Sequence, residues 1–409
     1  MVAFVIRGPR TILALLTALN LLNYLDRFVV SAVLEGIKTE LSLSGWLAGN
    51  LATVFLIGYF VTSLVFGAWA DRVGHGGRKG LIALGIGVWS LATIASGLAG
   101  SAGALVAARA LVGVGEASYA TIAPTIIDDS APPDRKGRWL AIFYAAIPVG
   151  SALGYLVGGA VEGVTHSWRA AFFVGGAPGL ALALVCLLIA EPPRLASTEA
   201  PASVTSSART LLKLPLYRNA VGGYCAYTFA IGGFGFWAPY YLHVRYGLPM
   251  GRASFFFGLV TVAGGAIGTL LGGWLGDRAA RGRTTDQGVA RAALSICTLS
   301  AGLGAPLALG AIAAPSALGF YAAVFPCEIA LFLLGGPFNV AVLRSAPPEL
   351  RASAMALSIF ASHLLGDLWS PPLIGFIADH APIAYGLLLV PAGFAVAAFG
   401  WWRAPVRLT

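Results

Sequence analysis

Residues 67–72 read GAWADR, and residues 273–278 read GWLGDR. Both segments have the form G-x-x-x-D-R, both follow a long apolar run, and further basic residues follow both of them. A second matching pair, residues 132–135 (PPDR) and residues 348–351 (PELR), stands after later apolar runs. The members of the two pairs lie 206 and 216 residues apart. These loops predict two halves related by duplication.

The composition indicates that lipid is the main solvent of this chain. Of its 409 residues, 58% are hydrophobic and 11% are charged, whereas an ordinary soluble domain has about 25% charged residues. These values exclude a soluble globular protein, and they exclude disorder, which needs low hydrophobicity and high charge. The four cysteines lie inside apolar runs without CxxC spacing, so we expect no disulfide framework, no metal site and no cofactor.

Twelve segments of the chain are long and apolar enough to cross a membrane, which takes about 20 residues. The predicted spans are 11–34, 45–70, 79–99, 102–127, 137–161, 169–190, 218–243, 252–276, 289–312, 316–343, 352–378 and 382–402. The polar stretch 191–217 separates the first six from the last six. We therefore expect an all-α polytopic membrane protein with an N-terminal six-helix bundle (1–190), a cytoplasmic linker (191–217) and a pseudo-symmetric C-terminal six-helix bundle (218–409).

The basic residues predict the orientation of these spans. Twenty of the 26 lysines and arginines fall on one side of the twelve-span arrangement. The six exceptions are Lys38, Arg169, Arg245 and Arg252 on the opposite side, and Arg27 and Arg109 inside spans. Because cytoplasmic loops carry the excess of basic residues, we expect both termini in the cytoplasm and the protein in a cell membrane, a bacterial inner membrane. The net charge of +9 is dispersed and forms no patch, so no nucleic-acid partner is expected.

Over nearly its whole length the chain resembles the major facilitator superfamily of transporters. Residues 67–79 are similar to that family's signature between spans 2 and 3, with residues 75–77 (HGG) inserted before Arg78 and Lys79. Residues 109–115 (RALVGVG) resemble its span 4 motif. Residues 154–159 (GYLVGG) resemble the span 5 glycine motif of antiporters, with a tyrosine where proline is usual.

The two G-x-x-x-D-R loops have a mechanical interpretation. Glycine lets helices approach closely, and the aspartate can cap a helix N-terminus or pair with arginine. The resemblance implies a cytoplasmic latch between the halves, made in one state and broken in the other. Its candidate residues are Gly67, Asp71, Arg72, Arg78, Asp277 and Arg278. The alternative is that these loops carry orientation charge only.

Four shorter segments narrow the resemblance to the spinster subfamily. They are residues 23–27 (NYLDR), 115–118 (GEAS), 335–339 (GGPFN) and 363–379, which begins HLLGDLWSP. Each segment is short, but each falls in the span where the subfamily has it. The resemblance implies a proton-linked carrier, which in eukaryotic relatives moves lysolipids and sphingoid lipid phosphates.

Ionisable side chains at membrane depth are costly, so each is a functional candidate. Asp26 and Arg27 are adjacent and point about 100° apart on one helix, so one of them must find a partner on a neighbouring helix or face water. Arg109 and Glu116 lie two turns apart on nearly one face, and in the family fold spans 1 and 4 line the central cavity. A carboxylate between burial and a nearby arginine can load and release a proton. We therefore predict Asp26 and Glu116 as the proton-coupling residues; a fixed ion pair that only holds helices together is the alternative.

Secondary candidates are Arg109, Glu328, His363 and Asp367. The last two are four residues apart and share a helix face, which fits either a local hydrogen bond or a role in gating or proton transfer. The string HxxxD also matches an acyltransferase-like pair, so an intramembrane acyltransferase is the alternative of another class. The sequence has no HExxH, GxSxG or GxxxxGK[ST] motif, which leaves proteolysis, serine hydrolysis and ATP-driven pumping without machinery. We expect a carrier and not an enzyme.

The expected substrate is an amphipath with an anionic head and an apolar tail, such as a lysophospholipid or a sphingoid phosphate, moved by alternating access. Arg27 is expected to meet the head, and aromatic side chains of the seventh span the tail. The candidate substrate-binding residues are Arg27, Tyr24, Tyr119, Phe236, Trp237 and Asn339. The alternative is a proton-coupled carrier of a small polar solute or a drug. The other expected partners are protons and the lipid bilayer. We expect the carrier to be a monomer.

Overall fold

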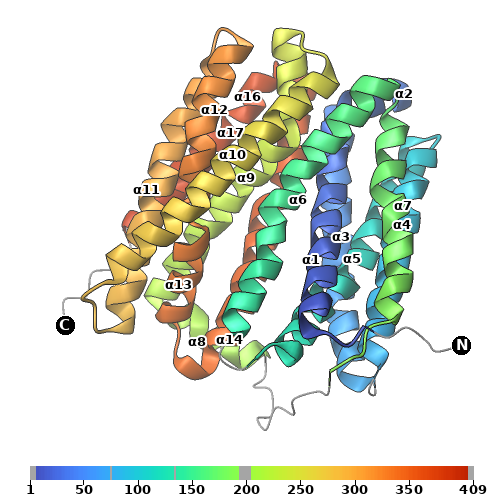
Figure 1. Cartoon of the computed structure of the whole chain (residues 1–409). Helices are drawn as coiled ribbons and strands as arrows, with labels where there is room; N and C mark the ends of the chain where they lie inside the picture. Colours follow the sequence, from blue (N-terminus) through green and yellow to red (C-terminus); the bar gives the residue numbers. More distant parts are fainter. Residues whose placement is uncertain (1–5, 74–75, 133–134, 193–203, 404–409) are drawn as a thin grey trace, which may run out of the picture. The chain divides into compact units, whose positions relative to one another are not determined.

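The computed structural model describes residues 6–73, 76–132, 135–192 and 204–403 (Figure 1). In this part of the chain the regular elements are helices, and an isolated bridge joins Ile6 to Ile189. The all-α prediction is confirmed. The chain divides into two compact units, residues 1–198 with 242–258, and residues 199–241 with 259–409.

Unit 1 is a bundle in which α1 packs along α6, α3 along α5, and α4 between α5 and α7. Its helices are α1 (Pro9–Ala32), α2 (Leu34–Leu41), α3 (Gly45–Arg72), α4 (Gly77–Leu98), α5 (Ala102–Ser130), α6 (Lys136–Thr165) and α7 (Trp168–Leu187). Residues 242–258 also belong to this unit: Ser254 donates a hydrogen bond to the carbonyl of Ala32, and Phe257 packs edge-on against Tyr155. Segments from the two predicted halves thus share one compact unit.

Unit 2 is built around α11, which packs against α12, α13 and α17. The remaining helices of the chain are α8 (Val204–Lys213), α9 (Pro215–Tyr246), α10 (Met250–Ala280), α11 (Asp286–Ala313), α12 (Ala317–Phe332), α13 (Gly335–Ser345), η1 (Pro348–Leu350), α14 (Arg351–Ser362), η2 (His363–Asp367), α15 (Ser370–His380), α16 (Ile383–Leu387) and α17 (Leu389–Trp402). The ends of α9 and α10 that face their shared turn are the residues that belong to unit 1.

Ten helices of the described residues are long and apolar enough to cross a membrane. The two other predicted spans correspond to α9 and to the run from α14 to α15. The first of these is rich in tyrosine and glycine, which lower its mean hydropathy. The second is divided by the π-helical turn η2 into helices of 12 and 11 residues.

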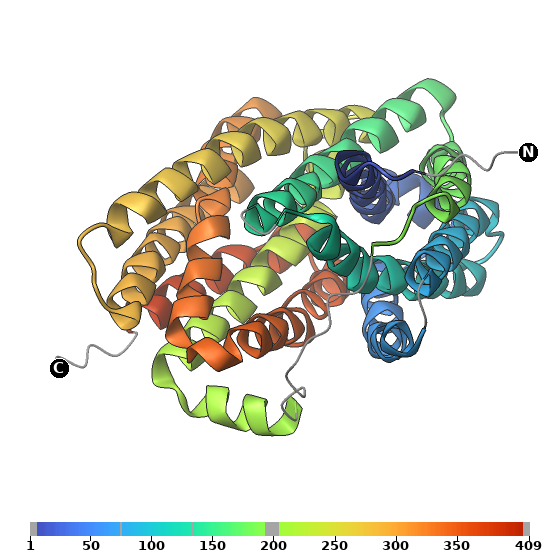
Figure 2. The ribbon, with the colours of Figure 1, turned by 60° about the horizontal axis from the view of Figure 1, so that its bottom comes forward.

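The predicted linker contains a helix that its polar composition did not indicate. Helix α8, yellow-green in Figure 2, lies within residues 191–217, and α9 begins at Pro215. Helix α8 is amphipathic: Leu211 is buried, while Arg209 and Lys213 are exposed, and the helix packs against α14. A polar composition concealed this helix because only a narrow face of it is apolar.

Side-chain caps and glycines explain several helix starts and contacts. The hydroxyls of Ser44, Ser101, Thr285 and Ser316 accept hydrogen bonds from backbone N–H groups at the starts of α3, α5, α11 and α12, as N-cap residues do. On α6, a Cβ added at Gly154 would lie 2.6 Å from the carbonyl oxygen of Leu25. Glycine is therefore what lets α6 approach the backbone of α1.

Candidate functional site

Two adjacent residues of α1 meet two residues of α5 in the interior of unit 1. The Nε atom of Arg27 lies 2.8 Å from Oε2 of Glu116, and Nη1 of Arg109 lies 3.8 Å from Oδ2 of Asp26. Both carboxyl groups are fully buried. The four ionisable residues predicted in spans 1 and 4 thus form a single charge cluster, in which each residue of α1 has its partner on α5.

Thr93 of α4 also belongs to this cluster, although the sequence did not predict it. Its hydroxyl donates a 2.7 Å hydrogen bond to Oδ2 of Asp26, and both side chains are buried. Threonine is common in membrane spans and carries no charge, so no sequence signal distinguished this position from other hydroxyl residues of α4.

Aromatic rings surround the arginines of the cluster. The Cζ atom of Arg27 lies 4.7 Å from the ring centres of Tyr24 and Phe55 and 5.2 Å from that of Tyr59. The Cζ atom of Arg109 lies 5.5 Å from the ring centre of Phe55. A guanidinium near an aromatic face is stabilised by the ring quadrupole, so Phe55 serves both cations. Of these rings, only that of Tyr24 belongs to a residue predicted from the sequence.

The cluster contains buried polar atoms that have no hydrogen-bond partner among the described residues. They are Oδ1 of Asp26, Nε and Nη1 of Arg109 and Oε1 of Glu116; Nδ2 of Asn23, one turn before Arg27 on α1, also lacks such a partner. Buried polar atoms in proteins are nearly always paired. The cluster therefore has buried donors and acceptors whose hydrogen-bonding capacity the described residues do not fill.

Three predicted substrate-binding residues lie in packed interiors. Tyr119 is fully buried in unit 1, where its hydroxyl donates to the carbonyl of Leu16. Trp237 is fully buried in unit 2 and donates from Nε1 to the carbonyl of Pro371, at 2.8 Å. Phe236 is also buried. In the conformation of this structure these side chains contact protein neighbours.

The candidates of the second half do not form one cluster with each other. Glu328 of α12 is 5% exposed and has neither a hydrogen bond nor an ion pair with the described residues; it packs beside Gly264 of α10. Asn339 is exposed on α13. His363 and Asp367 lie together in η2, where Nδ1 of the histidine is 2.9 Å from Oδ2 of the aspartate. This contact is the local hydrogen bond that their spacing allowed.

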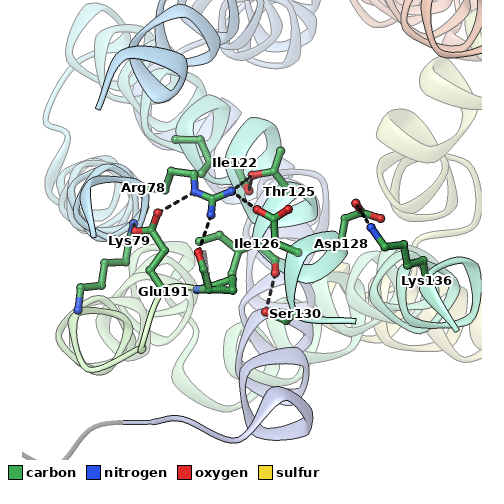
Figure 3. A network of polar contacts seen from close by, with 11 residues as sticks. Arg78, Lys79, Ile122, Thr125, Ile126, Asp128, Ser130, Lys136 and Glu191 are labelled. Atoms are coloured by element: carbon green, nitrogen blue, oxygen red, sulfur yellow. Dashed lines mark hydrogen bonds and ion pairs between the residues drawn. The ribbon is translucent and has the colours of Figure 1, made fainter. Parts of the chain in front are cut away.

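Arg78 is the centre of a second polar network in unit 1 (Figure 3). The arginine is 4% exposed; its Nε lies 2.7 Å from Oε1 of Glu191, and its Nη1 lies 2.6 Å from Oδ2 of Asp129. It also donates to Thr125 and to the carbonyl of Pro192. In this structure Arg78 ties α4 to α5 and to the segment after α7. Neither carboxylate was predicted, because Glu191 lies at the start of the predicted linker and Asp129 beyond the predicted span 4.

The other predicted latch residues have few contacts within their own units. Gly67 of α3 packs beside Thr121 of α5, and Arg72 is exposed at the end of α3. The side chain of Asp71 lies outside the described residues. Asp277 and Arg278 are exposed on α10.

Unit 2 contains a network like that of Arg78 with the charges exchanged. Asp286, the first residue of α11, lies 2.6 Å from Nη1 of Arg344 and 2.6 Å from Nη2 of Arg351. In unit 1, Arg78 near the start of α4 pairs with two carboxylates. In unit 2, Asp286 at the start of α11 pairs with two arginines. The geometry supports the internal repeat at the level of side-chain contacts.

Comparison with known proteins places the chain in a family. The sequence profile described as Major Facilitator Superfamily matches residues 16–371. "Protein spinster" of Drosophila melanogaster is 33% identical over 373 residues, which are 88% of this chain and 60% of the fly protein. "Protein spinster homolog 1" of Xenopus tropicalis is 38% identical over 399 residues, 91% of this chain and 74% of that protein. "Probable sphingolipid transporter spinster homolog 2" of Arabidopsis thaliana is 32% identical over 408 residues, 91% of this chain and 81% of the plant protein.

Solved structures show the same fold. A bacterial homologue of the human lysosomal transporter spinster, in an inward-facing and occupied conformation, superposes with a TM-score of 0.84 at 21% identity and covers 97% of both chains. A D-xylose–proton symporter superposes with a TM-score of 0.71 at 18% identity, covering 97% of both chains. The predicted fold of twelve transmembrane helices in two pseudo-symmetric bundles is confirmed. The chain is a multi-pass membrane transporter that belongs to the major facilitator superfamily and, within it, to the spinster proteins.

Proposed function

We propose that this transporter is a proton-coupled secondary carrier of an amphipathic, lipid-like substrate with an anionic head. The observation that carries the proposal is the buried cluster of two carboxylates and two arginines on α1 and α5. When all four groups are charged, their formal charges cancel. Binding of one proton leaves a net positive charge, which an anionic head group can neutralise.

Asp26 and Glu116 are the proton carriers of this proposal. Burial disfavours a charged carboxylate, and a nearby arginine favours it, so a small change of surroundings decides whether the proton binds. Asp26 is 3.8 Å from its arginine, whereas Glu116 is 2.8 Å from its own. The longer contact makes Asp26 the carboxylate that exchanges its proton with less disturbance of the ion pairs.

Arg27 couples the proton to the substrate. Glu116 is paired with the Arg27 guanidinium in the structure. An anionic head group must therefore compete with this carboxylate for the guanidinium. A proton that Asp26 takes up and passes to Glu116 removes the competitor and strengthens binding of the head. By linkage, bound substrate then favours bound proton to the same extent. This competition supports movement of proton and substrate together.

A lipid-like substrate is supported by the family and by the surroundings of Arg27. One relative is named a probable sphingolipid transporter, and the other spinster proteins share extended identity with this chain. The rings of Tyr24, Phe55 and Tyr59 border the guanidinium, which gives the head-group site an apolar rim where an acyl chain can begin.

The test is uptake into proteoliposomes that contain the purified protein and an imposed pH gradient. A fluorescent lysophospholipid serves as the lipid-like probe, and radiolabelled xylose serves as the small polar probe. Uptake of the lysophospholipid that depends on the gradient supports the proposal, and uptake of xylose alone favours the carrier of a polar solute.

Asp26→Asn should abolish the part of lysophospholipid uptake that depends on the pH gradient, because asparagine cannot exchange a proton. The matched control is Asp379→Asn, which removes an exposed carboxylate on α15 and should transport like the wild type. Size-exclusion chromatography and thermal unfolding of both variants check that the protein is folded. An unchanged pH dependence in folded Asp26→Asn would contradict the assignment of the proton.

A further inference from the structure

The two oxygens of the Asp26 carboxylate have different surroundings. Thr93 donates its 2.7 Å hydrogen bond to Oδ2, and Arg109 approaches the same oxygen at 3.8 Å. Oδ1 is buried and accepts no hydrogen bond from the described residues. The carboxylate is thus held by one oxygen from α4 and α5, and its other oxygen is unused.

Helix α7 leaves room beside the unused oxygen. A Cβ added at Gly175 would lie 3.6 Å from Oδ1 of Asp26, with Thr93 and Leu25 as its next neighbours. That is ordinary van der Waals contact, so glycine at this position presents bare backbone to Oδ1. Space for a proton on Oδ1 therefore exists without movement of a side chain.

Among the described residues, the charged groups that face Asp26 come from α1 and α5. They are Arg27, Arg109 and Glu116. The other helices that reach this region, α4, α6 and α7, have their charged residues near their ends, at Arg78, Lys79, Lys136, Arg138, Glu162 and Arg169. The hydroxyl of Thr93 is therefore the neutral contact that distinguishes the two oxygens.

We propose that Thr93 is a positioning residue, which anchors Oδ2 of Asp26 and directs the exchangeable proton to Oδ1. The inference rests on the proposed role of Asp26 as a proton carrier. An oxygen that already accepts a hydrogen bond and faces a guanidinium is a poor site for a proton, whereas Oδ1 has neither contact. A hydronium ion gives its proton to Oδ1 and leaves as water, the hydrogen bond from Thr93 stays on Oδ2, and the formal charge of the cluster rises by one.

Thr93→Val tests this role because valine keeps the shape of the side chain and lacks the hydroxyl. A hydrogen bond to a carboxylate favours its charged form, so its loss should make Asp26 easier to protonate. We expect the pH of half-maximal uptake in proteoliposomes to rise by about one unit, with a smaller change in maximal uptake. Thr93→Ser retains the donor and should restore the wild-type pH profile.

Ser96→Ala is the matched control on the same helix. Ser96 is buried, and its hydroxyl donates at 2.9 Å to the carbonyl of Ala92 in its own helix. Its removal should leave the pH profile unchanged. If valine at position 93 lowers stability too far for reconstitution, Thr93→Ala removes the same donor and should give the same upward shift.

An infrared titration of the purified protein separates this inference from the proposed function. The carbonyl band of protonated Asp26 is identified by its loss in Asp26→Asn, and its midpoint should rise in Thr93→Val whether or not transport depends on protons. A pH-independent wild-type transporter would remove the proposed coupling and leave the positioning role standing. A midpoint that is unchanged or lower in Thr93→Val, with Thr93→Ser equal to the wild type, would overturn the positioning role.

Discussion

At the residue scale, Glu40 joins two helices of unit 1. Arg169 donates to its Oε1 at 2.5 Å, and the indole of Trp168 donates to its Oε2 at 2.6 Å. Arg169 also donates to the carbonyls of Gly97 and Ala99. One carboxylate therefore links the end of α2 to the start of α7, while its arginine holds the end of α4.

These contacts predict a pH dependence of stability. The hydrogen bonds from Arg169 and Trp168 hold the pKa of the Glu40 carboxyl below its ordinary value. Because the pKa is lower in the folded state, the contribution is complete above the unfolded pKa and is lost as the pH falls through the folded pKa. Glu40→Gln should lower the Tm at neutral pH by at most about 2 °C, and thermal unfolding in acid should show no difference from the wild type.

Arg169→Gln provides the comparison for this pair. In that background the Glu40→Gln substitution should have a smaller effect on the Tm, since the principal donor is already absent. Equal effects of Glu40→Gln in both backgrounds, at every pH, would argue against the pair as the cause.

At the element scale, close approach of α1 and α6 depends on glycine. A Cβ at Gly154 would lie 2.6 Å from the carbonyl oxygen of Leu25 and 2.7 Å from the Cβ of Phe28. Gly154→Ala should therefore force the helices apart and destabilise the protein by about 1–3 kcal/mol. Thermal unfolding of the purified protein in detergent measures this change.

The control for the helix contact lies on α6 itself. A Cβ at Gly163 would meet no atom within 4 Å, so Gly163→Ala should leave the stability unchanged or raise it by up to about 1 kcal/mol. Similar losses of stability in both variants would show that the contact with α1 is not the cause.

The elements differ in how far the sequence predicts them. Long apolar runs predict most of the spans, because a helix is the structure that satisfies its own backbone in lipid. The turn η2 could not be predicted in this way. Gly366 packs beside Thr228 of α9, and Asp367 packs beside Gly232 of the same helix, so contacts with another helix accompany the break between α14 and α15.

At the scale of the whole molecule, the distribution of basic residues predicts the topology. A cysteine in the turn after α10, Thr284→Cys, should face the cytoplasm, and Gly100→Cys between α4 and α5 should face the opposite side. Both positions are exposed, and the four native cysteines are buried, which keeps background labelling low. A membrane-impermeant maleimide should label Gly100→Cys in intact cells and Thr284→Cys only after permeabilisation.

Labelling of both cysteines from the same side would contradict the predicted arrangement of spans. The reverse pattern, with Thr284→Cys labelled in intact cells, would invert the orientation and leave the number of spans intact. Permeabilised cells serve as the control, since both positions should react there.

The membrane class, the duplicated halves and the four charged residues of the α1–α5 cluster follow from the sequence alone. Apolar runs, repeated loops and rare charges are local features of the sequence. In lipid an apolar run must form a helix, and a charge at membrane depth is costly, so both can be interpreted without the structure. The packing of the helices sets which partner each charge has, and it brings Thr93, Phe55 and Tyr59 to the cluster. It also gave Arg78 the acids Asp129 and Glu191, and it placed Trp237 in a packed interior. Such pairings depend on how helices that are distant in sequence face one another. The neutral or aromatic residues that complete them cannot be distinguished, in the sequence, from other residues of an apolar span.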